Sequence, residues 1–504
     1  MSLIDVKNLS FSYYGGYGEI FENASFQIDT DWKLGLIGRN GRGKTTFLNL
    51  LAGKYEYEGK ISSGVKFVYF PFEVKDKTRL TREVVFGINT DAEEWRIYHE
   101  LSLLGVDEGL LYRPFDTLSG GEQTKILLAA LFLNENDFML IDEPTNHLDG
   151  EARRAVAEYL RRKKSFILVS HDRDFLDGCV DHILAINRKN IEVTSGNFSV
   201  WFENFKRRQA FETTQNERLQ RDISRLKETA ARTAVWADKT EKSKYGKASS
   251  GLKQDKGFVG YKAAKMMQRA KSAENRFMRA AEQKSQLLQN VETEERLKLN
   301  PLEYRTEKLL SVCDMQIYYG DNAVFEPLTF SLSRGERVAL DGGNGSGKSS
   351  VLKLIVGEKI ERVGAVTLGS GLKISFVPQS AEGLSGNLSD YARERGIDES
   401  LFKAILSKTG FEKSQFEGDI SNFSQGQKKK VLIAASLCER AHIYIWDEPL
   451  NYIDIFSRIQ IEKLICEFKP TMLFVEHDAA FRRAVATKTV KLKKAGKSAL
   501  PIGN

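Results

Sequence analysis

Cysteine is scarce in this 504-residue chain, and long apolar runs are missing from it. The cysteines are widely separated and form no CxxC pair, which is typical of reduced, buried thiols in a cytoplasmic protein: Cys179, Cys313, Cys438 and Cys466. The longest apolar runs are short, such as residues 126–133, and none approaches the ~18 residues that a membrane helix needs. The opening MSLIDVKNLSFSYY has no basic stretch followed by an apolar one, so we expect no signal peptide.

The chain is too long for one domain and suits two or three. Apolar residues make up 41% and charged residues 28%, as in ordinary globular proteins. The net charge of +7 is uneven, because residues 206–284 hold 21 Lys and Arg against 9 Asp and Glu, and the remainder is therefore net acidic. We expect a polyanionic partner to bind this basic segment.

The sequence repeats itself at an offset of about 304 residues, which indicates a duplicated domain. LGLIGRNGRGKTTFLNLLAG (34–53) matches VALDGGNGSGKSSVLKLIVG (338–357), FMLIDEPTNHLD (138–149) matches IYIWDEPLNYID (443–454), and LVSHD (168–172) matches FVEHD (474–478). Short apolar runs alternate with helical patterns in each half, which favours an α/β sheet. We expect domains at 1–200 and 301–504, joined by a linker at 201–300.

The linker has the pattern of two coiled-coil helices. Apolar residues recur three and four positions apart in two series: Leu219, Ile223, Leu226 and Ala230, then Met266, Ala270, Ala273, Phe277 and Ala280. Glycines interrupt the pattern between them, so we predict an antiparallel helical hairpin with its tip near 243–262. Each arm would have about 35 residues and span roughly 50 Å.

Each half carries a glycine-rich phosphate-binding loop between an apolar strand and a helix. The first loop is Gly38, Arg39, Asn40, Gly41, Arg42, Gly43, Lys44 and Thr45; the second is Gly342, Gly343, Asn344, Gly345, Ser346, Gly347, Lys348 and Ser349. Backbone N–H groups would surround ATP phosphates, the lysines would reach the β- and γ-phosphates, and Thr45 and Ser349 would bind Mg²⁺. The alternative is a merely structural glycine-rich turn.

Two carboxylates end an apolar strand in each half. Asp142 and Asp447 suit Mg²⁺, while Glu143 and Glu448 would orient and polarise the attacking water. A strand-end acid pair at a helix cap is the structural alternative. His171 and His477, each followed by Asp, would contact the γ-phosphate unless they are structural.

With LSGGEQ (118–123) and FSQGQK (423–428), the chain resembles ATP-binding cassette (ABC) proteins with two cassettes. The resemblance implies two mixed sheets flanked by helices, and cassettes that pair head to tail within one monomer. Each ATP would lie between one phosphate loop and the other cassette's signature, which comprises Ser119, Gly120 and Gly121 in the first half and Ser424 and Gly426 in the second. It also implies adenine-stacking aromatics at Tyr13 (or Tyr14) and Tyr319, a Mg²⁺- and water-contacting Gln379, and coupling-loop residues Asp149 and Asp454.

Two departures from the family pattern fall in one composite site. Gln425 replaces a signature glycine, and Phe72 stands where the second half has Gln379. We therefore expect the site of Lys44 and Glu143 to hydrolyse ATP more slowly than the site of Lys348 and Glu448.

The basic linker, GNFS (196–199) and the asymmetric second half resemble the ABC-F family, most closely its antibiotic-resistance branch of the Lsa type. That resemblance implies a partner ribosome, with large-subunit rRNA at the exit site and tRNA in the peptidyl site, and protection from lincosamides, pleuromutilins and streptogramin A. Candidate RNA contacts at the tip are Lys244, Lys253, Lys256, Phe258, Tyr261 and Lys262. Alternatives are an ABC-F translation factor that rescues stalled ribosomes, or the ATPase subunit of an importer, which would need a membrane subunit that we do not expect.

Overall fold

The structure is a computed structural model of the full chain. It describes residues 2–14, 19–89, 93–134, 137–146, 148–187, 190–242, 261, 264–265, 268, 271–272, 275–279, 301–320 and 322–495. The chain divides into two compact units: Met1–Trp201 with Leu297–Asn504, and Phe202–Arg296. The first unit therefore contains both halves of the sequence repeat, called cassette 1 and cassette 2 below.

Cassette 1 is built on a six-stranded sheet, of which five neighbouring strands are parallel and β9 is antiparallel. In spatial order the strands are β5 (Lys66–Phe70), β6 (Asp137–Asp142), β7 (Phe166–Val169), β3 (Lys33–Gly38), β8 (His182–Ile186) and β9 (Ile191–Ser195). An antiparallel sheet joins β2 (Phe21–Asp29), β1 (Leu3–Phe11) and β4 (Glu58–Ser62). The helices are α1 (Lys44–Leu51), α2 (Thr81–Ile88), α3 (Glu94–Leu103), α4 (Gly120–Leu131), α5 (Gly150–Arg162) and α6 (Arg173–Cys179).

Cassette 2 repeats this plan. Its parallel sheet has the order β15 (Ile374–Val377), β16 (Ile443–Asp447), β17 (Met472–Val475), β13 (Arg337–Asp341) and β18 (Lys488–Lys491). Its antiparallel sheet comprises β10 (Lys308–Tyr319), β11 (Asn322–Ala323), β12 (Leu328–Ser333) and β14 (Arg362–Leu368). The helices are α9 (Lys348–Val356), α10 (Leu388–Glu394), α11 (Glu399–Lys408), α12 (Gln425–Cys438), α13 (Ile455–Phe468) and α14 (Ala479–Val485).

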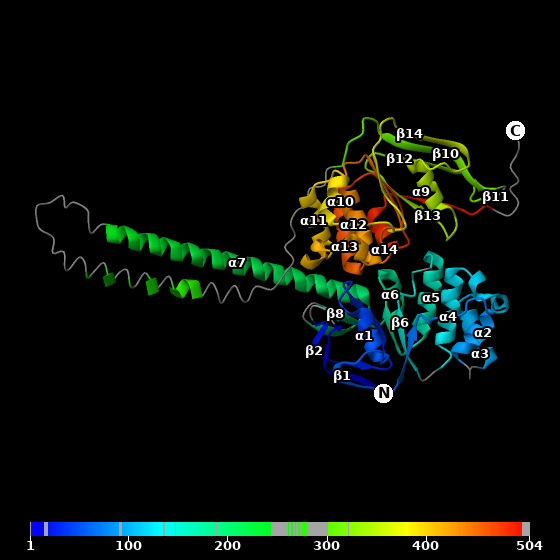
Figure 1. The fold of residues 1–504 in the computed structure, drawn as a ribbon, viewed down its shortest axis with the longest axis horizontal. Coiled ribbons are helices and arrows are strands. Elements are labelled where there is room, and N and C mark those ends of the chain that lie inside the picture. The colour runs from blue at the N-terminus through cyan, green and yellow to red at the C-terminus, as the bar shows by residue number, and fades with distance from the viewer. Residues whose placement is uncertain are drawn as a thin grey trace, which may run out of the picture. The chain divides into compact units, whose positions relative to one another are not determined.

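The central strands are apolar on both faces because helices or a second sheet cover both faces. All four residues of β7 and of β17 are buried, as are all five of β16. In cassette 2 one apolar cluster lies between the parallel sheet and α10–α13, and another lies between that sheet and β10 and β12. Figure 1 shows α10–α13 grouped together, apart from β10, β12 and β14. The predicted fold class, two α/β cassettes with mixed sheets, is confirmed.

The helix α7 (Phe198–Lys242) has 45 residues and follows cassette 1 (Figure 1). It is longer than the predicted arm of about 35 residues. Its first turn, in which Phe198 and Trp201 are buried at 3% and 2% exposure, precedes the predicted linker and accounts for part of the difference. Residues 275–279 are helical as well. The predicted tip near 243–262 lies outside the described residues, except for Tyr261.

The expectation that the cysteines are buried is confirmed only for Cys179. All four are free, but Cys438 and Cys466 are half-buried. Cys313 is exposed, since β10 alternates its side chains and Cys313 falls on the outward side. Among the described helices, none is both long and apolar enough to cross a membrane.

Candidate functional site

The two glycine-rich loops each follow a parallel strand and open a helix. α1 begins at Lys44 and α9 at Lys348, and the preceding Gly43 and Gly347 both have φ of 87°. A Cβ on Gly43 would lie 2.5 Å from Ile20 Cγ2, and a Cβ on Gly347 would lie 2.9 Å from Val324 Cγ1. Both positions therefore require glycine, for conformation and for space. The remaining loop residues wrap the N-terminus of each helix, where backbone N–H groups favour an anion.

The loop lysines point back into their own loops. Lys44 Nζ donates to Gly38 O at 2.9 Å and Arg39 O at 3.3 Å, and Lys348 Nζ donates to Gly342 O at 2.8 Å and Gly343 O at 3.0 Å. Burial lowers the pKa of both ammonium groups, and this is opposed by Asp454 for Lys44 and by Glu448 for Lys348. Each lysine therefore lies at the centre of a concentrated set of charges, the environment that a phosphate-binding lysine needs.

A hydroxyl and a carboxylate meet beside each lysine. Thr45 Oγ1 donates to Asp142 Oδ2 at 2.8 Å, and Ser349 Oγ donates to Asp447 Oδ1 at 3.1 Å. These oxygen donors fit Mg²⁺, which is usually held by one or two protein oxygens together with substrate phosphates. In cassette 1, Tyr69 Oη also donates to Asp142 Oδ2 at 3.0 Å.

Glu448 is held by three side chains from three different segments. Gln379 Nε2 and Asn451 Nδ2 donate to Glu448 Oε2 at 2.9 and 2.8 Å, and His477 Nε2 lies 3.2 Å from Oε1. Burial alone would raise the pKa of Glu448, but His477, Gln379 and Asn451 outweigh it and lower the pKa to about 2. The Glu448 carboxylate is therefore ionised and oriented.

Glu143, the counterpart of Glu448, has a different environment. His171 Nε2 lies 3.1 Å from Glu143 Oε1 but outside hydrogen-bond geometry, and this buried oxygen has no hydrogen-bond partner in the described part of the chain. Burial and the neighbouring Asp142 raise the pKa of Glu143 to about 8. Phe72, packed 6.3 Å from the Phe70 ring, stands where cassette 2 has Gln379. The two carboxylates therefore differ in charge near neutral pH.

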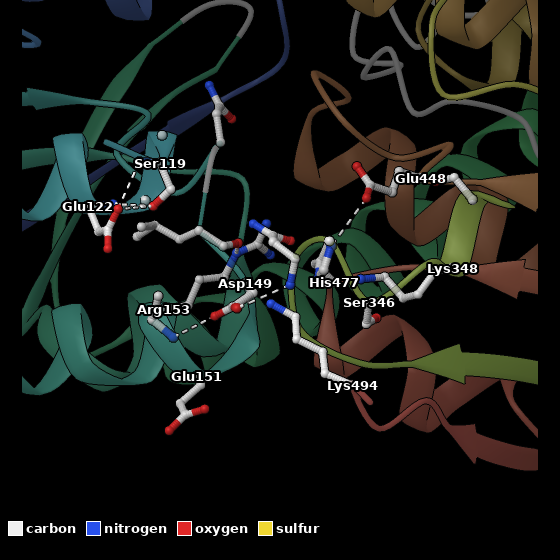
Figure 2. Close-up of a pocket in the computed structure, with 18 of the residues that line it drawn as sticks. Ser119, Glu122, Asp149, Glu151, Arg153, Ser346, Lys348, Glu448, His477 and Lys494 are labelled. Atoms are coloured by element: carbon white, nitrogen blue, oxygen red, sulfur yellow. Dashed lines mark hydrogen bonds and ion pairs between the residues drawn. The ribbon is translucent and has the colours of Figure 1, made fainter. Parts of the chain in front are cut away.

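A cavity of about 1190 Å³ lies between the cassettes. Cassette 1 contributes Ser119, Gly120 and Gly121 to its wall; cassette 2 contributes the loop 344–350 and Tyr319, Gln379, Glu448 and His477. Figure 2 shows Ser119 and Asp149 on one side facing Lys348, Glu448 and His477 on the other. Asp149 Oδ2 accepts a bond from Asn344 N at 3.4 Å across this cavity. The structure thus brings together residues that the family resemblance paired.

The opposite composite region is tighter. A cavity of about 280 Å³ is lined by Tyr13, the first glycine-rich loop, Asp142, Glu143 and His171. Asn40 Nδ2 donates to Tyr452 O at 2.8 Å, and a Cβ on Gly426 would lie 3.2 Å from Asn40 Nδ2. Arg42 also pairs with Glu412 at 3.0 Å. The second signature therefore lies against the first glycine-rich loop.

Both signature serines cap helices. Ser119 Oγ accepts from Glu122 N, and Glu122 Oε2 accepts from Ser119 N, so the pair forms a capping box at the start of α4. Ser424 and Gln427 do the same for α12. The N-terminus of α4, where Ser119 lies, therefore lines the cavity between the cassettes, and its backbone N–H groups favour an anion there.

The remaining predicted residues have varied positions. Tyr13 and Tyr319 are 43% and 60% exposed, and their hydroxyls lie 2.9 Å from Thr46 and Ser350 hydroxyls beside the glycine-rich loops. Asp454 is buried against Lys430 at 2.9 Å, unlike Asp149. Of the predicted RNA contacts only Tyr261 is described, with 66% exposure.

Sequence reasoning missed several residues at these sites. Tyr69 and Lys494, which lines the larger cavity, belong to no motif that we used. Asn451 lies within the motif at 443–454, but no role was predicted for it. A comparison of the two halves could have indicated Tyr69, because its counterpart in cassette 2 is Phe376, which lacks a hydroxyl. Nothing in the sequence pattern marked Lys494.

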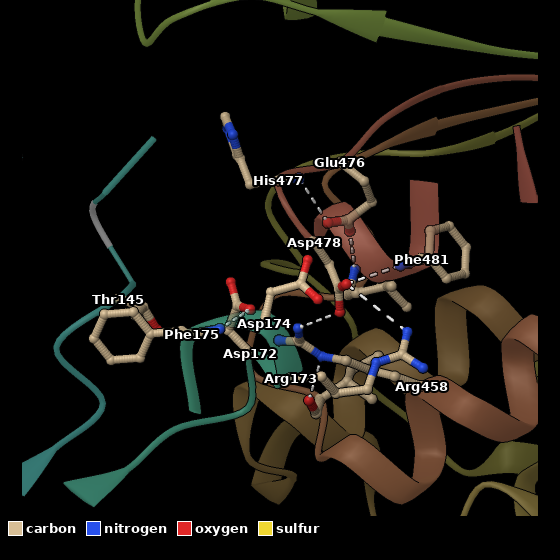
Figure 3. Close-up of polar contacts among 12 residues, drawn as sticks. Thr145, Asp172, Arg173, Asp174, Phe175, Arg458, Glu476, His477, Asp478 and Phe481 are labelled. Atoms are coloured by element: carbon tan, nitrogen blue, oxygen red, sulfur yellow. Dashed lines mark hydrogen bonds and ion pairs between the residues drawn. The ribbon is translucent and has the colours of Figure 1, made fainter. Parts of the chain in front are cut away.

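Charged residues also form ion pairs between the cassettes, from α6 to α13 and α14. Arg173 Nη2 lies 2.7 Å from Glu462 Oε2 and 3.8 Å from Asp478 Oδ1, and Arg483 pairs with Asp174 at 2.7 Å. Figure 3 shows Arg173 and Arg458 converging on Asp478. Burial would raise the pKa of Asp478, but Arg458 and Arg173 hold it below its usual value.

Comparison with known proteins agrees with this architecture. The model of the ABC transporter family matches residues 21–146 and 325–451, once in each cassette. YfmM of Bacillus subtilis, an ABC transporter ATP-binding protein, is 26% identical over 97% of this chain and 98% of its own length. Ribosome protection protein VmlR of the same species is 27% identical over 92% of this chain and 82% of VmlR.

Among solved structures, archaeal ribosome recycling factor aABCE1, in complex with stalk protein aP1, has a TM-score of 0.63 at 20% identity, covering 96% of this chain and 87% of that one. At that identity the likeness concerns the fold. The chain therefore belongs to the ABC transporter family, as an ATPase with two cassettes in one polypeptide and with relatives of the ABC-F type.

Proposed function

We propose that this chain is a ribosome-binding ABC-F ATPase that protects the peptidyl-transferase centre from antibiotics. The observation that carries the proposal is the similarity to ribosome protection protein VmlR over 479 residues, 92% of this chain. That span exceeds the two segments matched by the family model, so it includes more than the cassettes that ABC proteins share.

In this proposal ATP binds at two composite sites with Mg²⁺. Lys44 and Lys348 contact the phosphates, Thr45 with Asp142 and Ser349 with Asp447 hold the metal, and the signature of the opposite cassette closes each site. When bound, Mg²⁺ would neutralise charge that develops on the phosphates. The cavity that joins Ser119–Gly121 to Lys348 and Glu448 supports this pairing.

Hydrolysis requires a base or orienting group for water. Glu448, ionised and fixed by Gln379, Asn451 and His477, suits that role. Glu143 and His171 take the same role in the other site, with slower turnover because Glu143 favours its protonated form and Phe72 replaces a polar side chain.

The linker acts on the ribosome. A 45-residue helix is about 68 Å long at 1.5 Å per residue, which suits reach into a deep RNA site. The excess of Lys and Arg in 206–284 offsets phosphate repulsion, so binding weakens as salt rises. We propose that the linker enters from the tRNA exit site, next to peptidyl-site tRNA. Its tip then reshapes the pocket that binds lincosamides, pleuromutilins and streptogramin A, either directly or through rRNA and tRNA. ATP binding closes the cassettes and holds this state; hydrolysis releases the ribosome.

Drug susceptibility tests the resistance role. We expect expression of the chain in a sensitive host to raise the inhibitory concentrations of lincomycin and tiamulin, and replacement of 243–262 by a Gly-Ser segment of equal length to abolish the increase. The replaced protein serves as its own folding control through its ATPase activity. If the unmodified chain gave no protection, the resistance role would be excluded.

Two alternatives make different predictions. A translation factor that rescues stalled ribosomes would bind ribosomes without any change in drug susceptibility. An importer subunit would sediment with membranes instead, and we expect co-sedimentation with ribosomes.

A further inference from the structure

Two buried positions carry opposite charges in cassette 2 and neutral residues in cassette 1. Alignment of the signature helices places Lys429 opposite Thr124, and alignment of FVEHD with LVSHD places Glu476 opposite Ser170. Lys429 is 1% exposed and Glu476 is 4% exposed. Buried charges are costly unless paired, so a lysine and a glutamate that differ together between the halves indicate a functional pair.

Lys429, on α12, bonds two backbone carbonyls. Its Nζ donates to Pro378 O at 2.9 Å and to Glu448 O at 3.2 Å. Pro378 directly precedes Gln379, and Glu448 has a φ of 44°, which is uncommon for a residue with a side chain. The ammonium group therefore ties the Gln379 segment to the strained backbone of Glu448.

Glu476 bonds two backbone N–H groups. Its Oε1 accepts from Leu450 N at 2.7 Å, and its Oε2 accepts from His477 N at 3.0 Å. Figure 3 shows the Glu476 carboxylate beside the start of α14, linked to His477. Leu450 directly precedes Asn451 in the chain, so this carboxylate fixes the backbone that carries Asn451 and the backbone that carries His477.

The segments that the pair fixes are those that hold the Glu448 carboxylate. Gln379, Asn451 and His477 make its side-chain contacts, at 2.8–3.2 Å. Lys429 bonds the carbonyl of Pro378, next to Gln379, and the carbonyl of Glu448 itself. Glu476 bonds the N–H of Leu450, next to Asn451, and the N–H of His477. Neither charged group touches the Glu448 carboxylate in these contacts, so both act through the backbone.

Electrostatics links the two groups. Burial lowers the pKa of Lys429 to about 8, and Glu476 is the strongest of the charges that oppose this, ahead of Asp447 and Glu448. Burial raises the pKa of Glu476, and Arg458 opposes that shift. Removing one member would leave the other as an uncompensated buried charge.

The counterparts in cassette 1 are uncharged hydroxyl residues. Thr124 Oγ1 donates to Gly120 O at 2.8 Å in its own helix. Ser170 Oγ accepts from Asp172 N at 3.2 Å and lies 3.4 Å from the Thr145 hydroxyl, which follows Glu143 by two residues. The Glu143 carboxylate, as described above, is less well held. The cassette that has the pair thus holds its glutamate, Glu448, with three side chains, whereas the cassette without the pair leaves an oxygen of Glu143 without a partner in the described part of the chain.

We propose that Lys429 and Glu476 are a positioning pair for ATP hydrolysis at the Lys348 and Glu448 site, which they serve by fixing the backbone segments around Glu448. The inference rests on the proposed ATPase sites and adds two residues to which no role in those sites was assigned. In this proposal neither Lys429 nor Glu476 contacts the nucleotide.

The test uses the full chain with Glu143→Gln, so that turnover reports the second site. On this parent we would compare Lys429→Thr, Glu476→Ser, the isosteric Glu476→Gln, and the double swap Lys429→Thr with Glu476→Ser, which restores the residues of cassette 1. Each single change should lower kcat about tenfold or more, with the KM for ATP changed less than about threefold, because the glycine-rich loop is untouched. The double swap should lower kcat about as much as one single change and not by the product of the two, since the two groups act together on the segments around Glu448.

Thermal unfolding of each variant separates positioning from folding. We expect Glu476→Gln to lose kcat while its Tm stays near that of the parent. The proposal would be overturned by unchanged kcat in the single variants or by a raised KM with unchanged kcat. It would also be overturned by a double swap whose kcat returns to that of the parent or falls by the product of the two single effects. Turnover by the parent itself tests the ATPase assignment, so the two failures are distinguishable.

Discussion

At the residue scale, two glutamates with the same place in the sequence repeat differ in charge because of their neighbours. Glu448 accepts bonds from Gln379 and Asn451 and lies beside His477, whereas Glu143 lies beside Asp142 and has an unpartnered buried oxygen in the described part of the chain. An ionised carboxylate can polarise water; a protonated one must first lose its proton.

The comparison of Glu448→Gln with Glu143→Gln tests this difference. We expect Glu448→Gln to lower multiple-turnover ATPase by about 10²-fold and Glu143→Gln to lower it much less, because the second site supplies most turnovers. The measurement is steady-state phosphate release by the purified chain. Unchanged turnover in Glu448→Gln together with lost turnover in Glu143→Gln would reverse the ranking.

Motif spacing predicted Lys44, Lys348 and the carboxylates after them, since strand, loop and helix follow one another in the chain. It did not predict Asn451, Lys429 or Glu476, because their contacts depend on loops that meet only in the folded cassette. Gln425 and Phe72 did indicate an asymmetry, and the unequal environments of Glu143 and Glu448 are consistent with it.

At the element scale, the signature helices combine a structural cap with a site. Ser119 starts α4 through a capping box with Glu122 and also lines the larger cavity. Ser424 starts α12 in the same way, with Gln427 as its partner. Loss of either hydroxyl should therefore affect both stability and one ATP site.

Ser119→Ala should lower the free energy of unfolding by about 1 kcal/mol, the usual value of an N-cap. It should also slow the Lys348 and Glu448 site when measured with Glu143→Gln. Ser424→Ala is the matched control, since it removes the equivalent cap but belongs to the other composite site. If both serine variants slowed the second site equally, the assignment of signatures to sites would be wrong.

Helix and strand periodicity predicted both α/β cassettes, and the structure confirms that fold class. Part of the length of α7 was missed because Phe198 and Trp201, in its first turn, are buried, so apolar residues there do not follow the coiled-coil spacing used to define the arm. The outward position of Cys313 was missed because the period-2 alternation of β10 was not considered.

At the scale of the whole molecule, the two cassettes are joined by ion pairs that differ between the halves. Arg173 and Asp174 follow His171 and Asp172 in cassette 1, whereas Ala479 and Ala480 follow the matching Asp478 in cassette 2. The crossed pairs of Arg173 with Glu462 and of Arg483 with Asp174 favour pairing of unlike cassettes.

Arg173→Ala should lower the free energy of unfolding by about 2–3 kcal/mol at pH 7, because it leaves Asp478 with Arg458 alone. The folded-state pKa of Asp478 is lowered, so its contribution is present above its unfolded value of about 3.9 and is lost as pH falls through the folded value. The difference between wild type and variant should thus shrink below about pH 4. Urea unfolding at pH 7, 4 and about 3 measures it, and a difference that stays constant down to the lowest pH would show that Asp478 is not the group concerned.

The most direct test of the account is ribosome binding by the Glu143→Gln, Glu448→Gln double variant. With both hydrolysis sites blocked, the cassettes should stay closed on ATP, and the variant should co-sediment with ribosomes in ATP but much less in ADP. Added salt should weaken this binding steeply, since the linker is basic. A double variant that sediments free of ribosomes in ATP at low salt would contradict the account.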